Sequence, residues 1–196
     1  MANITLDKIA EYVKACKRCG LSATRTHAVP GEGCPTAKLM CIGEGPGFHE
    51  DQQGRPFVGE SGHLLDKILA ASGFSRQSNT FIANIVKCRP PNNRDPLPEE
   101  RQACLPLLLK QIEIVNPTII VLLGATALKG LIDPEARITR LRGKWMEWQG
   151  RMVMPTYHPS ALLRNPELKR PVWEDFKLVI DKYRELVDPN HHSDYH

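Results

Sequence analysis

Residues 118–126 read Thr-Ile-Ile-Val-Leu-Leu-Gly-Ala-Thr, an almost unbroken apolar run that stops at a glycine. A strand that is buried on both faces of a parallel sheet has this composition, whereas a strand with one face in water alternates apolar and polar residues. A short helical pattern follows directly at residues 125–131. The stretch therefore predicts a buried strand, a tight turn and a covering helix.

Three more β-rich runs lie along the chain, at residues 38–42, 80–85 and 151–156. Helical patterns occupy residues 62–72, 98–115, 125–131 and 173–186, and a shorter one lies within residues 1–19. Strands that alternate with helices form βαβ units, in which helices cover a parallel sheet on both sides. The 196 residues suffice for one such domain and leave little room for a second. We therefore expect a single α/β domain.

The composition is that of a water-soluble protein with a small positive charge. Lys and Arg number 26 against 22 Asp and Glu, a formal net charge of +4. This charge is compatible with nucleic-acid binding and equally with an ordinary solvated surface. No apolar run reaches the roughly 20 residues that cross a bilayer, and the first residues lack the pattern of a secretory signal. We expect a cytoplasmic protein without a membrane segment.

The cysteines suggest a metal site. Cys16 and Cys19 form a Cys-x-x-Cys pair, and Cys88 and Cys104 follow far downstream. A reducing cytosol disfavours structural disulfides, so such spacing indicates metal ligands. From the spacing alone, zinc and an iron–sulfur cluster are equally good, since four thiolates suit either. The two remaining cysteines, Cys34 and Cys41, stand alone.

Polar and glycine-rich segments follow all four predicted strands. Gly43-Glu44-Gly45 follows the first strand, Asn84 ends the second, Gly124 follows the third and His158 follows the fourth. In open α/β sheets, ligands bind beyond the carboxyl ends of the strands. The sequence therefore predicts a pocket where these four segments meet.

Several of these residues also have structural explanations. A lone histidine such as His158 is more often structural than catalytic, and Phe57 could simply pack in the core. Asn84 interrupts an apolar strand and needs partners, either from the backbone or from a ligand. Glycine-rich backbone lets a flat base approach closely, and an exposed Phe57 could stack on that base. Leu162 and Leu163, beside Arg164 on an expected exposed loop, would suit a wedge that enters a DNA duplex.

Two other protein classes remain to be weighed. A nucleotide-binding Rossmann domain needs G-x-G-x-x-G at the start of a helix, whereas Gly43-x-Gly45-x-Gly47 leads into Phe-His-Glu-Asp and a further loop. A non-catalytic nucleic-acid-binding protein with a four-thiolate metal site fits the charge, but it leaves Glu44 and the other polar strand ends without a purpose.

The motifs together resemble the uracil-DNA glycosylase superfamily, and specifically its iron–sulfur (family 4) branch. The resemblance runs from about residue 16 to residue 181. The segments that carry it are Gly43-Glu-Gly-Pro-Gly47, Gly54-Arg-Pro-Phe-Val-Gly59, Asn84-Ile-Val-Lys-Cys-Arg-Pro-Pro-Asn-Asn93, Val121-Leu-Leu-Gly-Ala-Thr126 and His158-Pro-Ser-Ala-Leu-Leu-Arg164.

The resemblance implies a single three-layer α/β/α domain with a four-stranded parallel sheet. It implies a glycosylase domain over residues 1–187, followed by a polar tail at residues 188–196 that we expect to fray. A structural [4Fe–4S] cluster would be held by Cys16, Cys19, Cys88 and Cys104. The implied substrate is uracil-containing DNA, single- or double-stranded, and the implied state is a monomeric, prokaryotic-type intracellular enzyme.

The resemblance also implies roles for the residues that bind the base. Gly43 and Gly45 would let uracil approach the backbone, and Phe57 would stack on it. The amide of Asn84 would donate to O4 and accept from N3–H, a pattern that cytosine reverses. His158 would donate to O2 as charge develops on the leaving base.

The remaining roles concern water and DNA. Gly45 stands where the best-known branch has a water-activating Asp, so Glu44 and Asn93 would position the attacking water instead. Leu162 would be the wedge, with Ser160 and Arg164 holding phosphates. The segment after Lys87 lacks the inserted basic loop and histidine of the branch that traps its product covalently, so we expect simple hydrolysis.

Overall fold

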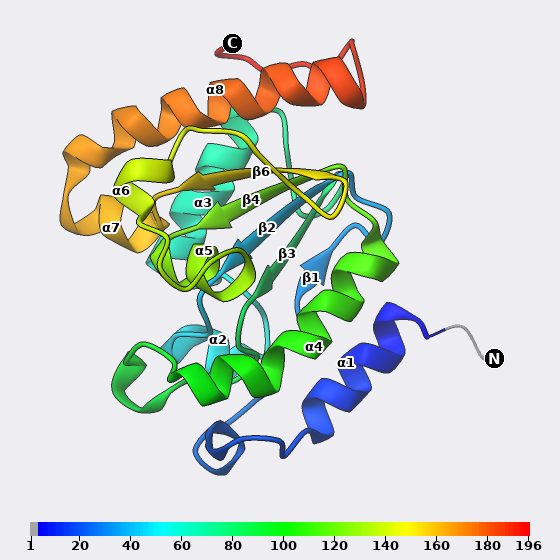
Figure 1. Ribbon diagram of the computed structural model, residues 1–196, viewed down its shortest axis with the longest axis vertical. Coiled ribbons are helices and arrows are strands. Elements are labelled where there is room, and N and C mark those ends of the chain that lie inside the picture. The colour runs from blue at the N-terminus through cyan, green and yellow to red at the C-terminus, as the bar shows by residue number, and fades with distance from the viewer. Residues whose placement is uncertain (1–3) are drawn as a thin grey trace.

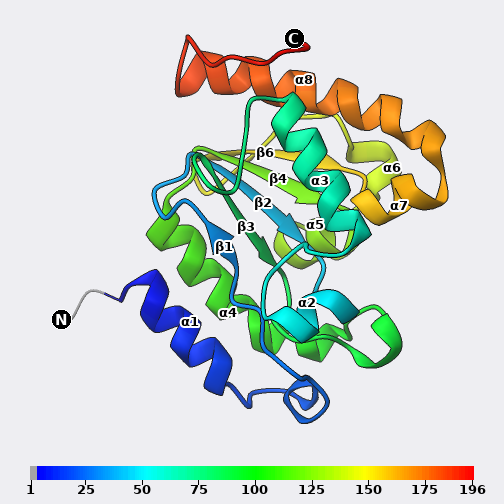
Figure 2. The same ribbon diagram turned by 180° about the vertical axis from the view of Figure 1, so that it is seen from behind.

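A computed structural model describes residues 4–196 as a sheet between two layers of helices (Figures 1 and 2). The strands are β1 (Glu32–Gly33), β2 (Leu39–Gly43), β3 (Thr80–Asn84), β4 (Ile119–Leu123), β5 (Met146–Trp148) and β6 (Arg151–Thr156). The main helices are α1 (Leu6–Ala15), α2 (Phe48–Gln53), α3 (Glu60–Ala71), α4 (Pro98–Val115), α5 (Ala125–Leu131), α6 (Ile138–Leu141), α7 (Pro159–Arg164) and α8 (Lys169–Leu186). Short 3₁₀ turns are η1 (Gly20–Ala23), η2 (Pro91–Asn93) and η3 (Pro166–Leu168).

The sheet has six strands in the order β1-β3-β2-β4-β6-β5. Its centre, β3-β2-β4-β6, is parallel, as the sequence predicted, whereas β1 and β5 pair antiparallel at the two edges. The prediction of a four-stranded sheet was therefore wrong in the number of strands. The two edge strands span two and three residues, which is too short for an alternation of apolar and polar residues to be recognised in the sequence.

The edge strand β5 follows from a local turn. Gln149 and Gly150 join β5 to β6, and both have positive φ, 48° and 74°. Two central residues with positive φ are the signature of a type I′ hairpin, whose twist matches that of the paired strands.

Residues of each central strand alternate between two cores. On β2, Met40 and Ile42 belong to the core that α1, α4 and α5 cover, whereas Leu39 and Cys41 belong to the core that α3 and α8 cover. Because successive side chains point to opposite faces, a strand buried on both sides must be apolar at every position. This explains the composition of residues 118–123 and establishes the three layers.

The C-terminal tail is packed rather than frayed. His191 lies over the ring of Phe74 with centroids 4.4 Å apart, and its Nε2 is 2.8 Å from the carbonyl oxygen of Ser72. The hydroxyl of Ser193 donates to the carbonyl of Ala71. The expectation of a frayed tail was therefore wrong, because its histidine and serine satisfy carbonyls at the end of α3.

Across residues 4–196, none of the helices combines the length and the apolar character needed to cross a membrane.

Candidate active site

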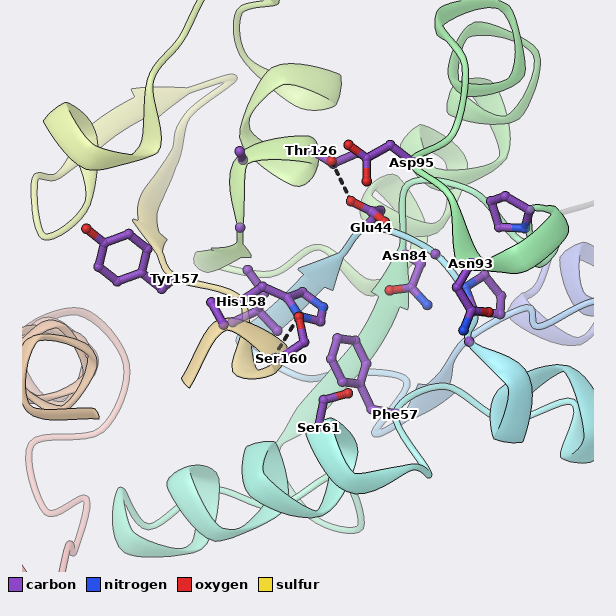
Figure 3. A pocket seen from close by; sticks show the side chains of 18 of the residues that line it. Glu44, Phe57, Ser61, Asn84, Asn93, Asp95, Thr126, Tyr157, His158 and Ser160 are labelled. Atoms are coloured by element: carbon purple, nitrogen blue, oxygen red, sulfur yellow. Dashed lines mark hydrogen bonds between the residues drawn. The ribbon is translucent and has the colours of Figure 1, made fainter. Parts of the chain in front are cut away.

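A pocket of about 560 Å³ opens at the carboxyl edge of the central strands. It is lined by residues at or just after the ends of all four strands, including Gly124 and, as Figure 3 shows, Glu44, Asn84 and His158. Gly124 has a φ of 97°, and a Cβ there would lie 2.9 Å from Cβ of His158. Glycine is thus required where the turns after β4 and β6 approach each other.

One wall of the pocket holds a buried amide without a partner. Asn84 is 2% exposed, and its Oδ1 makes no hydrogen bond within the described chain. The ring of Phe57 lies next to this amide: a Cβ at Gly43 would meet both Asn84 Oδ1 and Phe57 Cζ at 2.6 Å. Because a buried polar atom without a partner is costly, this oxygen indicates a ligand that supplies a donor.

His158 faces the same space as a neutral imidazole. Its Nδ1 accepts from the backbone N–H of Ser160 at 3.1 Å and lies 2.8 Å from the Ser160 hydroxyl. Burial, helped by the positive charge of Arg164, lowers the pKa of His158 to about 4. With Nδ1 occupied as an acceptor, the single proton of the neutral ring belongs on Nε2. The ring centroid is 5.5 Å from that of Phe57.

Glu44 is oriented by a hydroxyl from another strand end. Thr126, in the first turn of α5, donates to its Oε2 at 2.5 Å (Figure 3). Burial raises the pKa of Glu44, the bond from Thr126 opposes that rise, and the nearby negative charge of Asp95 adds to it. Asp95 and Asn93 also line the pocket. Figure 3 shows Glu44 and Asp95 on the side of the pocket opposite Phe57.

Arg89 connects Asn93 to an exposed aromatic residue at the pocket rim. Its Nε donates to Asn93 Oδ1 at 2.6 Å, and its guanidinium lies 5.3 Å from the ring centre of Phe48. Phe48 begins α2 directly after Gly47, which lines the pocket, and is 51% exposed.

The two leucines of α7 have opposite environments. Leu162 is 1% exposed and packs in the core with α3 and α8, whereas Leu163 is 44% exposed. Ala161 and Arg164, which flank the two leucines, line the pocket. Leu162 therefore cannot serve as an exposed wedge, and the assignment from the sequence was wrong. The helix starts at Pro159, which turns residue 162 inward and residue 163 outward.

A second, smaller cavity lies among Cys16, Cys19, Cys88 and Cys104, beside Arg25 and Lys87. Arg25 Nη1 lies 3.0 Å from Cys88 Sγ, and the backbone N–H of Lys87 lies 3.3 Å from Cys104 Sγ. The four predicted ligands are thus brought together from the segment between α1 and η1, the loop after β3, and α4. Between residues 4 and 196, however, no three His, Cys, Asp or Glu side chains are grouped as a metal ion requires.

Comparison with known proteins adds to this geometry. The sequence model of the Uracil DNA glycosylase superfamily matches residues 30–177. The chain belongs to this superfamily.

Relatives of the uracil-DNA glycosylase superfamily match almost the whole chain. The type-4 uracil-DNA glycosylase of Thermotoga maritima is 50% identical over 176 residues, which cover 88% of this chain and 91% of that protein. The type-4 uracil-DNA glycosylase of Sulfurisphaera tokodaii is 47% identical over 191 residues, or 93% of this chain and 85% of that protein. The type-5 enzyme of Thermus thermophilus is 33% identical over 178 residues, covering 81% and 80%. The chain is thus more similar to these type-4 members than to the type-5 member.

The glycosylase pocket includes residues to which the sequence assigned no role. Thr126 lies within a motif that was recognised, but only the structure shows its bond to Glu44. Asp95 also lines the pocket, although no motif pointed to it. Phe48, which is exposed next to the pocket-lining Gly47, was likewise found only from the structure. Cys41 is fully buried, which raises its pKa to about 12 and fits a packing residue.

Proposed function

We propose that this chain hydrolyses the N-glycosidic bond of deoxyuridine in DNA, releasing uracil and leaving an abasic site. The observation that carries the proposal is the unpartnered amide of Asn84 beside the ring of Phe57, in a pocket of about 560 Å³. Membership of a superfamily of DNA-repair glycosylases supports the same conclusion.

The pocket suits uracil better than cytosine. The Asn84 amide can donate to uracil O4 and accept from N3–H, whereas cytosine offers a donor at its 4-position and an acceptor at N3. Phe57 would stack on the base, while Gly43 and Gly45 leave room for its edge against the backbone.

His158 would stabilise the leaving base. As the glycosidic bond breaks, negative charge develops on uracil and positive charge on the sugar. A neutral imidazole with its proton on Nε2 can donate to O2 without transferring that proton, because its pKa of about 4 keeps the ring neutral near pH 7. The bonds from Ser160 to Nδ1 support this tautomer.

Glu44 and Asn93 would position the water that attacks C1′. Thr126 holds one carboxylate oxygen of Glu44 and leaves the other free to bind water. Arg89 holds Oδ1 of Asn93, so the amide nitrogen of that residue is free to turn toward the pocket. The water then passes a proton to the free carboxylate oxygen of Glu44 as its oxygen bonds to C1′, and the products are an abasic sugar and the uracil anion.

Leu163, Phe48 and nearby arginines would contact the DNA around the flipped nucleotide. Extruding a base costs a few kcal/mol, and apolar side chains inserted in its place offset part of that cost. Arg164 follows Leu163, and Arg89 stands over Phe48. With Ser160, these cations would bind phosphates on either side of the pocket. We expect the chain to act as a monomer, with residues 1–187 as the catalytic unit.

The four cysteines of the second cavity would hold a [4Fe–4S] cluster. Four cysteine thiolates are the ligand set of a [4Fe–4S] cluster, and the four cysteines surround one cavity. The resemblance to the iron–sulfur branch favours this cluster over zinc, which four thiolates also suit. Arg25 and the Lys87 backbone supply N–H···S bonds, and such bonds favour thiolates. The cluster would tie α1 to α4 and would supply no redox step to hydrolysis.

The test is excision from an oligonucleotide that contains a single deoxyuridine. Treatment with alkali cleaves the strand at an abasic site, so we expect cleavage at that position after incubation with the protein. The His158→Gln variant should lose about 10²–10³-fold in rate, the usual effect of removing one such donor. Intact DNA that the protein nevertheless binds tightly would instead identify a non-catalytic DNA-binding protein.

A further inference from the structure

Phe57 adopts a backbone conformation that an aromatic residue avoids. Its φ is 52°, in the left-handed region, and its side chain is 5% exposed. The left-handed region is unfavourable for a residue with a Cβ, which approaches the following carbonyl oxygen too closely there. Such a conformation persists only where surrounding groups hold it. The residues that hold this turn therefore determine where the ring lies.

Arg76 holds the turn from behind the pocket. It is 4% exposed and does not line the pocket. Its Nη1 donates to the carbonyl oxygen of Pro56 at 2.7 Å, and its Nη2 donates to that of Phe57 at 2.8 Å. Asp66 on α3 accepts from Nε and Nη2 at 3.0 and 2.9 Å and fixes the plane of the guanidinium. One rigid fork thus binds two successive carbonyls, a geometry that lysine cannot reproduce.

The opposite side of the turn is held by a carboxylate. Glu50 on α2 accepts from the backbone N–H groups of Val58 and Gly59 at 2.8 and 3.0 Å, and from Gly47 at 3.1 Å. Gly62 closes the space underneath, since a Cβ there would lie 2.1 Å from the carbonyl of Phe57. A buried cation on the carbonyls and a buried anion on the amides therefore fix the peptide planes around Phe57.

We infer that Arg76 is a positioning residue, which sets the ring of Phe57 over the flipped base without touching substrate. The inference rests on the proposed function, because it assigns Arg76 a part in binding uracil. Without the guanidinium, two buried carbonyls lose their donors and the turn can relax toward negative φ. The ring would then leave the face of the base, next to the amide of Asn84.

A double-mutant cycle separates this role from a general effect on folding. Arg76→Met should lower kcat/KM for uracil DNA by about tenfold to hundredfold, the range set by a stacking energy of ~1–3 kcal/mol per base. In a Phe57→Ala background the same change should cost less than about twofold, because a residue that acts through the ring has nothing left to position. Arg76→Lys should fall between wild type and Arg76→Met.

Measurements of DNA affinity supply a second readout, which does not depend on catalytic turnover. The Arg76→Met variant should bind DNA containing a non-hydrolysable deoxyuridine analogue more weakly than wild type. It should bind abasic DNA as tightly as wild type, since no base is present to stack. Lys110→Met is the control: Lys110 pairs with Glu113 on the outer face of α4 and, unlike Arg55, shares no partner with Arg76, so its loss should change neither affinity.

The outcomes are distinct. Equal losses from Arg76→Met in the wild-type and Phe57→Ala backgrounds, or equal losses of affinity for both DNAs, would overturn the positioning role while leaving uracil excision intact. Absence of uracil excision by the wild-type chain would overturn the proposed function itself.

Discussion

Asn84 is the residue that most directly indicates uracil as the ligand, because its buried amide oxygen has no partner and needs a ligand that supplies a hydrogen-bond donor. Asn84→Asp replaces an amide that donates and accepts by a carboxylate that only accepts. We expect kcat/KM on uracil DNA to fall about tenfold to hundredfold, as a lost buried hydrogen bond of ~1–3 kcal/mol implies. Steady-state excision kinetics measure this change. Asn190→Asp, in the exposed part of the tail, is the control; equal activity of all three proteins would refute the role of Asn84.

The lowered pKa of His158 predicts the protonation state of its ring. Burial lowers its pKa to about 4, below the ~6.5 of a free imidazole, so folding favours the neutral ring. Its contribution to stability is therefore complete above pH ~6.5 and is lost as the pH falls toward about 4. Nitrogen chemical shifts in NMR spectra should show a neutral ring with its proton on Nε2 at pH 7, and His158→Gln assigns the signal. A midpoint near 6.5, or a proton on Nδ1, would contradict this account.

At the scale of elements, α7 places two adjacent leucines in different environments, and we expect different functions from them. Leu163→Ala should reduce excision from double-stranded DNA more than from single strands, because only a duplex must be opened. Leu162→Ala should instead lower the free energy of unfolding by about 2–5 kcal/mol, since it leaves a cavity in the core. Thermal unfolding and excision assays on both variants test the pair. A reversed pattern, with Leu163 required for stability and Leu162 for duplex cleavage, would refute the assignment.

The same helix shows where prediction from sequence ends. The central strands and most long helices were predictable because apolar periodicity over many residues records burial, and α5 has the predicted bounds, Ala125–Leu131. The phase of α7 was not, because Leu162 and Leu163 are alike and only the helix start decides which one points inward. The edge strand β1 has two residues and exists through its pairing with β3, so it leaves no pattern in the sequence.

The residues that build the pocket likewise divide into those that the sequence could predict and those that it could not. Residues that follow strands, such as Glu44 and His158, could be found from the rule that ligands bind at carboxyl strand ends. Groups that act from another layer could not, because nothing in the sequence connects Arg76 to the carbonyl of Phe57, 19 residues earlier. The roles of the base- and water-contacting residues stay predictions until they are tested by mutation.

At the scale of the whole molecule, the cysteine site brings together the segment after α1, the loop after β3, and α4. We expect purified protein to be brown and to contain about four irons per chain. Cys88→Ser should lose iron and unfold at lower temperature, because α1 would no longer be tied to α4. Cys34→Ser should change neither property, since it is not among the residues lining that cavity. Metal analysis and thermal unfolding measure both effects; zinc in place of iron in the wild type would contradict the cluster.

Residues, elements and the whole fold thus meet in one pocket, built at four strand ends, which recognises uracil and excises it. Mass spectrometry of the free base released from oligonucleotides that differ only in carrying uracil, thymine or cytosine tests this most directly. The account predicts uracil alone, released in equal amount to abasic sites. Release of no base, or of thymine or cytosine as readily as uracil, would contradict it.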